Sequence, residues 1–304
     1  MSIDEVLDGL MKSHDDAPEA TANRLRVLAT QAVPADQLGR FTWLVNHVIG
    51  EKQGRWKDAN VLIGEVTRTH STLTLPPLRN AAVAALLSGD LLRACAAEAA
   101  LGTQHGLSAE QAALVVRAAA LSFLVTAARA GELAAGLLGI VQTLDSWDTA
   151  AGTATAADAS VAASLNNAVS ELIELDDAVL EAEGVREAVM RGAHASRTLW
   201  TRAGNWTNRE RADYLCAKAA NRLGDHTQAL DAAEHGLRTI DEHGVEDVDR
   251  AFLLLETVRA LRGLGRESDA TRHLSLADKL ASTWDDAELS AWYAEQSAAL
   301  RRAT

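Results

Sequence analysis

The sequence has little of what sheet-rich and disulfide-stabilised folds require. Its 304 residues include 2 cysteines, 4 prolines, 3 phenylalanines and 2 tyrosines. Strands favour aromatic and β-branched residues, and disulfide scaffolds need many cysteines, so neither class fits. Disorder is excluded as well, because 48% of the chain is hydrophobic. Alanine instead takes roughly a fifth of all positions, about twice its ordinary share. This composition predicts an all-α protein with closely packed helices.

The chain also lacks the positive charge that nucleic acids and anionic membrane surfaces attract. It has 29 lysines and arginines against 42 aspartates and glutamates, which gives a net charge of −13. Generic binding to either polyanion is therefore not expected. The most apolar stretch, residues 112–141, is interrupted by three charged residues, so it predicts buried helix and not a membrane span.

Two features predict a cytoplasmic location. The first residues are acidic, with Asp4 and Glu5, which is unlike a signal peptide. Cys95 and Cys216 are isolated within alanine-rich helical runs, which favours reduced cysteines in the core.

Nearly the whole sequence has helical periodicity. Apolar residues follow a 3.6-residue stripe in 114–125 and again in 251–261. Pairs of residues three apart predict capping boxes at helix starts: Ser2 with Glu5, Ser108 with Gln111, and Thr207 with Glu210.

Glycines recur with a spacing typical of stacked helical repeats. The glycines that suggest turns are separated by about 35–42 residues, with one gap of about twice that length. They are Gly54, Gly89, Gly131, Gly224 and Gly265. Four of them are followed five residues later by alanine, at Ala59, Ala94, Ala229 and Ala270. A glycine can close a tight turn after a helix, and a small residue soon afterwards lets the next helix approach closely.

This pattern resembles the tetratricopeptide repeat (TPR), which has glycine in the turn and small residues five and twelve positions later. Trp56, Gly236 and Ala277 fit further positions of that pattern. The resemblance implies a right-handed superhelix (solenoid) of stacked antiparallel helix pairs. We expect N-terminal capping helices in 1–34, repeats in 35–281 with a long loop near 145–158, and a C-terminal capping helix in 282–304. The turn between 141 and 206 is left open between Asp176–Asp177 and Gly184.

No catalytic motif is present in the sequence. It contains no His-Glu-x-x-His, no Cys-x-x-Cys, no phosphate-binding loop and no dinucleotide fingerprint. His235 and His243 are more simply explained as residues that complement a helix dipole than as metal ligands. We therefore expect a protein that is not an enzyme and has neither a cofactor nor a metal site.

The resemblance to TPR proteins implies a binding groove lined by the first helix of each pair. Counting back from the turn glycines assigns the apolar residues Phe41, Leu44 and Val48, and also Phe252 and Leu255, to this groove. Its polar lining would be Arg79, Arg129, Arg211, Tyr214, Lys218, Asn221, Arg222, Arg259 and Arg262. Most of these cations belong to the C-terminal half, as in the carboxylate clamp of some TPR domains.

Two interpretations of these cations stay open. Arginine binds carboxylates and phosphates well, which favours a peptide or protein partner with acidic groups. Alternatively, the cations pair with acids on neighbouring helices, such as Glu210, Asp213 and Glu256. The sequence thus predicts a non-enzymatic scaffold that binds a protein or peptide. The competing hypothesis is a regulator that senses a peptide or small molecule and acts through protein contacts.

Overall fold

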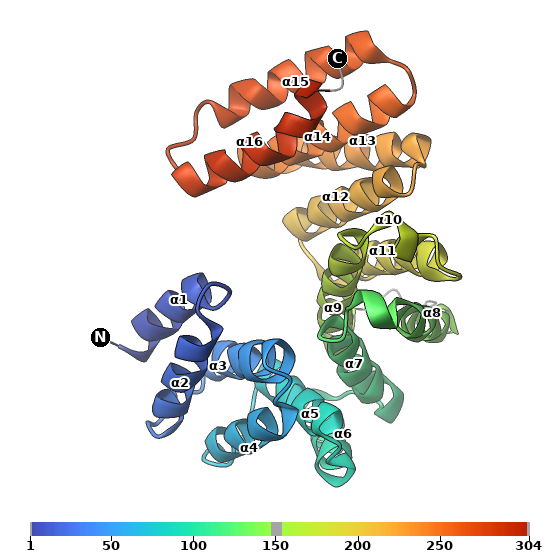
Figure 1. Ribbon diagram of the computed structural model, residues 1–304. Helices are drawn as coiled ribbons and strands as arrows, with labels where there is room; N and C mark the ends of the chain where they lie inside the picture. The colour runs from blue at the N-terminus through green and yellow to red at the C-terminus, as the bar shows by residue number, and fades with distance from the viewer. Residues whose placement is uncertain (1, 147–153, 303–304) are drawn as a thin grey trace. The chain divides into compact units, whose positions relative to one another are not determined.

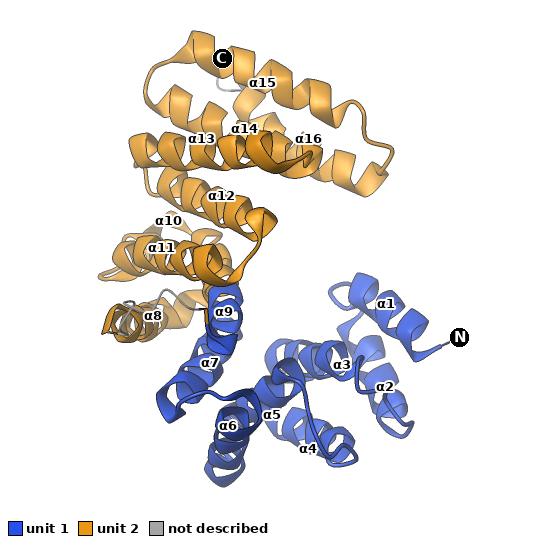
Figure 2. Cartoon of the chain, turned by 180° about the vertical axis from the view of Figure 1, so that it is seen from behind, with its two compact units in different colours: residues 1–124, 155–164 blue, residues 125–154, 165–304 orange. Residues whose placement is uncertain are grey.

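A computed structural model describes residues 2–146 and 154–302 of the chain (Figure 1). These residues form sixteen α-helices, a π-helix and a short 3-10 helix, without any strand. The predicted all-helical fold is confirmed. Contacts divide the chain into two compact units: unit 1 comprises residues 1–124 and 155–164, and unit 2 comprises 125–154 and 165–304 (Figure 2). Part of the expected loop near 145–158, residues 147–153, lies outside the described residues.

Unit 1 is formed by helices that pack mainly on their neighbours in sequence. Its elements are α1 (Ile3–Ser13), α2 (Pro18–Ala29), α3 (Leu38–Leu44), the π-helix η1 (Val45–Lys52), α4 (Trp56–Thr67), α5 (Leu75–Ser88), α6 (Leu91–His105) and α7 (Ala109–Ser122). The helices α4, α5 and α6 pack in succession, and η1 packs against α2 and α4. Two helices thus occupy the segment 1–34, for which capping helices are predicted.

Unit 2 contains the remaining helices. They are the 3-10 helix η2 (Ala127–Arg129), α8 (Ala130–Ser146), the second half of α9 (Ala156–Ile173), α10 (Asp177–Leu180), α11 (Val185–Ala203), α12 (Trp206–Arg222), α13 (His226–His243), α14 (Asp247–Gly263), α15 (Glu267–Ala281) and α16 (Ala287–Arg302). From α11 to α15 each helix packs against the next, and α16 packs against α14.

The predicted turn glycines end helices in the left-handed conformation. The φ angles are +65° at Gly54, +83° at Gly89, +80° at Gly224 and +74° at Gly265. After three of them the next residue donates its backbone N–H to the carbonyl oxygen five positions earlier. The Asp225–Ala220 bond of 2.9 Å is one example. This closure satisfies carbonyl groups that a helix end would otherwise leave unpaired.

Small residues after these turns bring paired helices together, as predicted. Ala59, Ala94, Ala229 and Ala270 are all buried. At Gly236 on α13, an added Cβ would lie only 3.0 Å from both terminal methyl carbons of Leu253 on α14. The α13–α14 contact therefore depends on the missing side chain of this glycine.

Three details of the sequence interpretation are wrong. Gly131 lies inside α8, and the chain turns before it, around the 3-10 helix η2. The cap of α12 is Asn205 in a capping box with Asn208, because Thr207 is already within the helix. Cys95 is exposed, whereas Cys216 is buried as expected.

The segment between 141 and 206 contains both of the predicted helix boundaries. The helix α9 ends at Ile173, shortly before Asp176, which caps the one-turn helix α10. Gly184 has a φ of +78° and precedes α11.

A further left-handed glycine, Gly106, escaped the sequence analysis because no alanine follows it five residues later. Among the described residues, no helix combines the length and apolar content needed to cross a membrane.

The left-handed turn predicts opposite effects for two Gly→Ala substitutions in unit 2. Gly224→Ala forces a Cβ into a φ of +80° and should destabilise the protein by about 1–2 kcal/mol. Gly139→Ala lies within α8, where no atom comes within 4 Å of the added Cβ, and should stabilise it by about 0.5–1 kcal/mol. Urea unfolding followed by circular dichroism measures both. Equal effects of the two substitutions would contradict the assigned turn.

Candidate functional site

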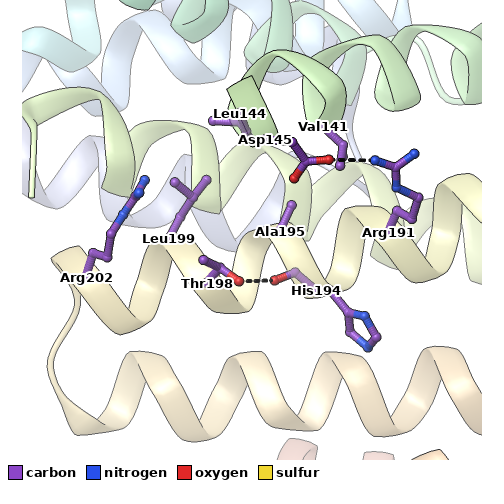
Figure 3. Close-up of a pocket in the computed structure, with 9 residues that line it drawn as sticks. All are labelled: Val141, Leu144, Asp145, Arg191, His194, Ala195, Thr198, Leu199 and Arg202. Atoms are coloured by element: carbon purple, nitrogen blue, oxygen red, sulfur yellow. Dashed lines mark hydrogen bonds and ion pairs between the residues drawn. The ribbon is translucent and has the colours of Figure 1, made fainter. Parts of the chain in front are cut away.

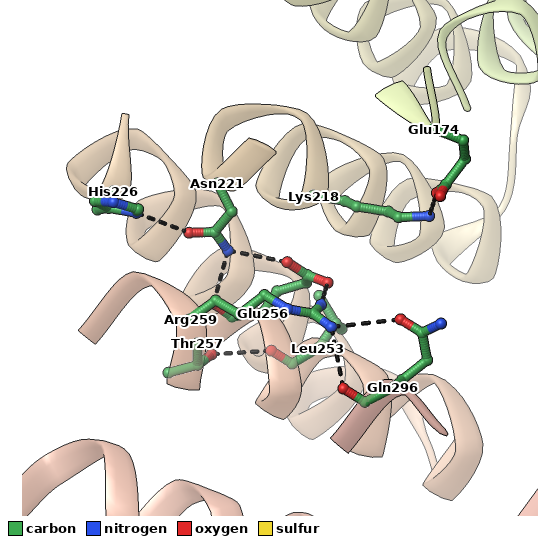
Figure 4. A network of polar contacts seen from close by, with 9 residues as sticks. All are labelled: Glu174, Lys218, Asn221, His226, Leu253, Glu256, Thr257, Arg259 and Gln296. Carbon is green, nitrogen blue, oxygen red and sulfur yellow. Dashed lines mark hydrogen bonds and ion pairs between the residues drawn. The ribbon is translucent and has the colours of Figure 1, made fainter. Parts of the chain in front are cut away.

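A cavity of about 450 Å³ in unit 2 brings together several of the predicted binding residues. It is bounded by the C-terminal end of α9 and by α12, α14 and α16. Lys218, Asn221, Arg222 and Arg259, all predicted from the sequence, line it. The other lining residues are Ile173, Glu174, His226, Glu256 and Gln296. We call this space the α12–α14 cavity (Figure 4).

Helical spacing explains why these side chains meet. Lys218, Asn221 and Arg222 are three and four residues apart on α12, so they share one face. Glu256 and Arg259 are three apart on α14, which packs against α12. Packing of the two helices therefore brings both polar faces to the same place.

A buried hydrogen-bond network forms one side of the α12–α14 cavity. Glu256 is only 1% exposed and accepts a hydrogen bond of 2.9 Å from the Asn221 Nδ2 group at its carboxylate. The same amide group donates to the Glu256 backbone oxygen, also at 2.9 Å. Arg259 pairs with the Glu256 carboxylate and donates to the backbone oxygen of Gln296 at 3.3 Å (Figure 4). Because a buried carboxylate is costly without partners, this network fixes the three side chains.

The other two cations pair with exposed carboxylates. The Lys218 Nζ atom lies 2.5 Å from the Glu174 Oε1 atom, and the Glu174 side chain is 62% exposed. Arg222 pairs with Asp177, whose side chain is 84% exposed. Arg222 also donates to the carbonyl oxygens of Ile173 at 2.9 Å and Leu175 at 2.7 Å, so it caps the C-terminal end of α9. Each of the three cations of the cavity therefore pairs with an acid, as the second interpretation expected, but only Lys218 and Arg222 use acids outside their own helix, because Glu256 lies three residues before Arg259 on α14.

The remaining predicted site residues do not line this cavity. In unit 2, Arg262 donates to the backbone oxygen of Leu300, and Tyr214 packs against the core around α14. Burial raises the pKa of the Tyr214 phenol. Arg129, on η2, pairs with Glu132 at 2.9 Å on the surface. In unit 1, Arg79 donates to Ser160 at 3.0 Å, and burial lowers the pKa of its guanidinium.

The assignment of apolar residues to a groove, which the resemblance implied, is wrong. Phe41, Leu44 and Val48 are fully buried in the core of unit 1. Phe252 and Leu255 on α14 are also buried, and the Phe252 ring lies 4.1 Å from the Trp292 ring of α16. Helix α16 therefore covers the part of α14 that the resemblance assigned to a groove.

A second cavity in unit 2, of about 350 Å³, lies between α8 and α11 and was not predicted (Figure 3). Val141, Leu144 and Leu199 give it an apolar wall, and Arg191 closes one side through an ion pair of 2.7 Å with Asp145. Burial lowers the pKa of His194, which also lines it. The repeat pattern does not register in this part of the sequence, so it could not indicate the cavity.

Comparison with known proteins adds no assignment. None of the protein-family models that were scanned matches the chain, and a search of curated proteins gives no significant match.

Arg211, the last of the predicted cations, lies beside the carboxyl group of Glu210, whose burial the sequence did not indicate. The Arg211 Nε atom is 2.8 Å from the Asp249 Oδ2 atom and 3.6 Å from the Glu210 Oε1 atom. Glu210 is fully buried, and within the described residues neither of its carboxyl oxygens accepts a hydrogen bond. Desolvation, followed by a hydrogen bond with Asp249, raises the Glu210 pKa to about 9. Glu210 is thus protonated at neutral pH and can donate to the Asp249 carboxylate.

This pKa predicts a pH-dependent effect of Glu210→Gln. Folded Glu210 retains its proton at a pH at which the unfolded side chain, with the ordinary pKa of 4.5, has lost it. Its contribution to stability is therefore complete below pH 4.5 and is lost as the pH rises toward 9. The substituted amide would mimic the protonated carboxyl at every pH. We expect the substitution to be nearly neutral at about pH 4 and to stabilise the fold by about 1–3 kcal/mol at about pH 8. Urea unfolding at both pH values tests this, and a stability difference that is independent of pH would contradict it.

Proposed function

We propose that this chain is a non-enzymatic helical-repeat protein of the TPR type that binds a peptide or protein segment through a carboxylate in the α12–α14 cavity. The proposal includes right-handed stacking of the helix pairs and a cytoplasmic location. The observation that carries it is the convergence of Lys218, Arg222 and Arg259 at one cavity. The left-handed glycines and the buried alanines that follow them support the repeat class.

The cations of the cavity differ in how easily a partner could reach them. The pairs Lys218–Glu174 and Arg222–Asp177 use strongly exposed carboxylates, and such pairs contribute little stability. A carboxylate of the partner can replace them at a small cost. The Arg259–Glu256 pair involves a buried carboxylate, so separating these residues would leave a charge buried without its partner.

This difference divides the residues by role. Lys218 and Arg222 would contact the acidic group of the partner. Arg259 and Asn221 would form a fixed surface behind it, because their polar groups already bind Glu256 and Gln296. Asn221 is therefore a positioning residue in this proposal, in place of the peptide-binding residue that the sequence suggested.

The volume of the cavity supports a second candidate, a regulator that senses a small anionic molecule. A space of about 450 Å³ lies within the range of about 300–1,000 Å³ that is usual for small-molecule sites. This candidate uses the same two cations. It differs in predicting that a small carboxylate alone, without a peptide chain, raises the melting temperature.

The proposal is tested by asking whether the carboxylate of a peptide can replace Glu174 as the ion-pair partner of Lys218. Random peptides with free C-termini are selected on the purified protein, and the affinity of a selected acidic peptide is measured by fluorescence anisotropy. Lys218→Met should weaken binding about tenfold, or about 1.4 kcal/mol. Glu174→Gln should strengthen it severalfold because it removes the internal competitor. Arg272→Met, which removes an exposed cation of α15 in the same unit, is the matched control.

Two results would overturn the peptide proposal. One is the absence of any selected acidic peptide whose binding depends on Lys218. The other is stabilisation by small carboxylates such as citrate without binding of any peptide, which would favour the sensing regulator.

A further inference from the structure

A histidine cluster in unit 1 has the arrangement of a metal site. His14 follows α1, Asp15 lies in the turn before α2, and His47 is in the π-helix η1. The Nε2 atoms of His14 and His47 lie 3.5 Å and 3.6 Å from the two carboxylate oxygens of Asp15. Ligand atoms of all three residues lie within 4.8 Å of one another. Two histidines and a carboxylate form a ligand set that binds divalent transition metals.

The hydrogen bonds of the other ring nitrogens prepare both histidines for metal binding. His14 Nδ1 lies 2.7 Å from the backbone oxygen of Met11, and His47 Nδ1 lies 2.5 Å from Glu51 Oε2. Carbonyl and carboxylate oxygens only accept, so both Nδ1 atoms must donate a proton. In a neutral imidazole the Nε2 atom then carries the lone pair, and both lone-pair atoms are close to Asp15. Metal-binding histidines commonly have this second hydrogen bond to a carbonyl or carboxylate oxygen.

The ring positions are supported independently by an aromatic contact. Trp43 stacks on His47 with 4.9 Å between ring centroids and an interplanar angle of 13°. Its ring also meets His14 edge-on at 5.7 Å. The two imidazoles are mostly covered, with side-chain exposures of 12% and 19%, whereas Asp15 is 65% exposed and leaves the site open to solvent.

Each Nε2 atom lies at nearly the ligand spacing of a tetrahedral site from one oxygen of Asp15. Ligands at about 2.0–2.1 Å from a zinc ion in a tetrahedron are separated by about 3.3 Å. The separations of 3.5 Å and 3.6 Å, each from one Nε2 atom to a different oxygen of Asp15, are close to this value, and single ligand atoms of the three residues all lie within 4.8 Å of one another. We therefore propose that His14, Asp15 and His47 bind a divalent transition-metal ion such as Zn²⁺, with water in the fourth position.

Lys52 is an internal competitor for this ion. Its Nζ atom lies 2.5 Å from Asp15 Oδ1, next to the position that a cation would take. The π-helix accounts for its presence there, because hydrogen bonds from i to i+5 place residues five apart, such as His47 and Lys52, above one another. Metal binding would displace this ammonium group toward solvent.

The experiment compares variants with opposite expected effects. The full chain is stripped of metal and titrated with Zn²⁺ against a chromophoric chelator. We expect one equivalent to bind, His14→Gln and His47→Gln to weaken binding by more than about 100-fold, and Glu51→Ala to weaken it about 10–100-fold. Lys52→Met should bind Zn²⁺ more tightly than the wild type. His70→Gln, in the same unit but outside the cluster, should leave the affinity unchanged.

A second measurement separates metal binding from loss of folding. Circular dichroism confirms that each variant is folded, and Cu²⁺ should quench part of the tryptophan fluorescence through Trp43. This part of the quenching should disappear in Trp43→Phe. The proposal is overturned if the wild type leaves Zn²⁺ with the chelator, or if the folded His14→Gln/His47→Gln double variant retains the affinity of the wild type.

Discussion

The close approach of consecutive helices is the constraint on which the rest of the structure depends. A left-handed glycine reverses the chain within a few residues, and a small side chain five positions later allows the next helix to pack against the first. Ala229, which is fully buried after Gly224, shows the arrangement between α12 and α13. Because each helix is held in this way by its neighbour, its polar face has a defined direction. The face of α12 that lines the cavity is directed by the same packing that buries Ala229.

The sequence predicted the part of the fold that depends on local rules. A glycine followed five residues later by an alanine indicates a turn between two closely packed helices. Four of the five predicted turn glycines have a positive φ. Gly131 misled the prediction because glycine is also tolerated inside a helix, and here it lies near the start of α8. Asn205 replaced Thr207 as a cap because asparagine provides an acceptor of the same kind two residues earlier.

The prediction of side-chain direction succeeded on α12, but it failed for Phe252 and Leu255 on α14, which α16 covers, and for the residues before Gly54. On α12, counting back from Gly224 identified Lys218, Asn221 and Arg222, which do line a cavity. The same count from Gly54 crosses η1, and there the closing hydrogen bond runs from Arg55 to Ile49, six residues instead of five. This additional residue shifts by one position the residues that are assigned to the groove by counting back from Gly54. The less buried side of α3 and η1 consequently contains Arg40, Trp43 and His47, whereas the predicted Phe41, Leu44 and Val48 are in the core. A π-helix has no simple sequence signal, so the displacement could not be foreseen.

The histidine cluster was not found from the sequence because its residues are far apart in the chain. The ligand atoms come from His14 and Asp15 on one side and His47 on the other, and no short spacing connects them. In an α-helix, residues five apart point in different directions, so Lys52 would not accompany His47 toward Asp15. Glu51, four residues after His47, accepts a hydrogen bond from the imidazole as it could in an α-helix, whereas the π-helix brings Lys52 to the carboxylate as a counter-charge. Both contacts are part of the packing of the chain, and in the proposed site the ammonium group would have to leave Asp15 before a metal ion could bind there.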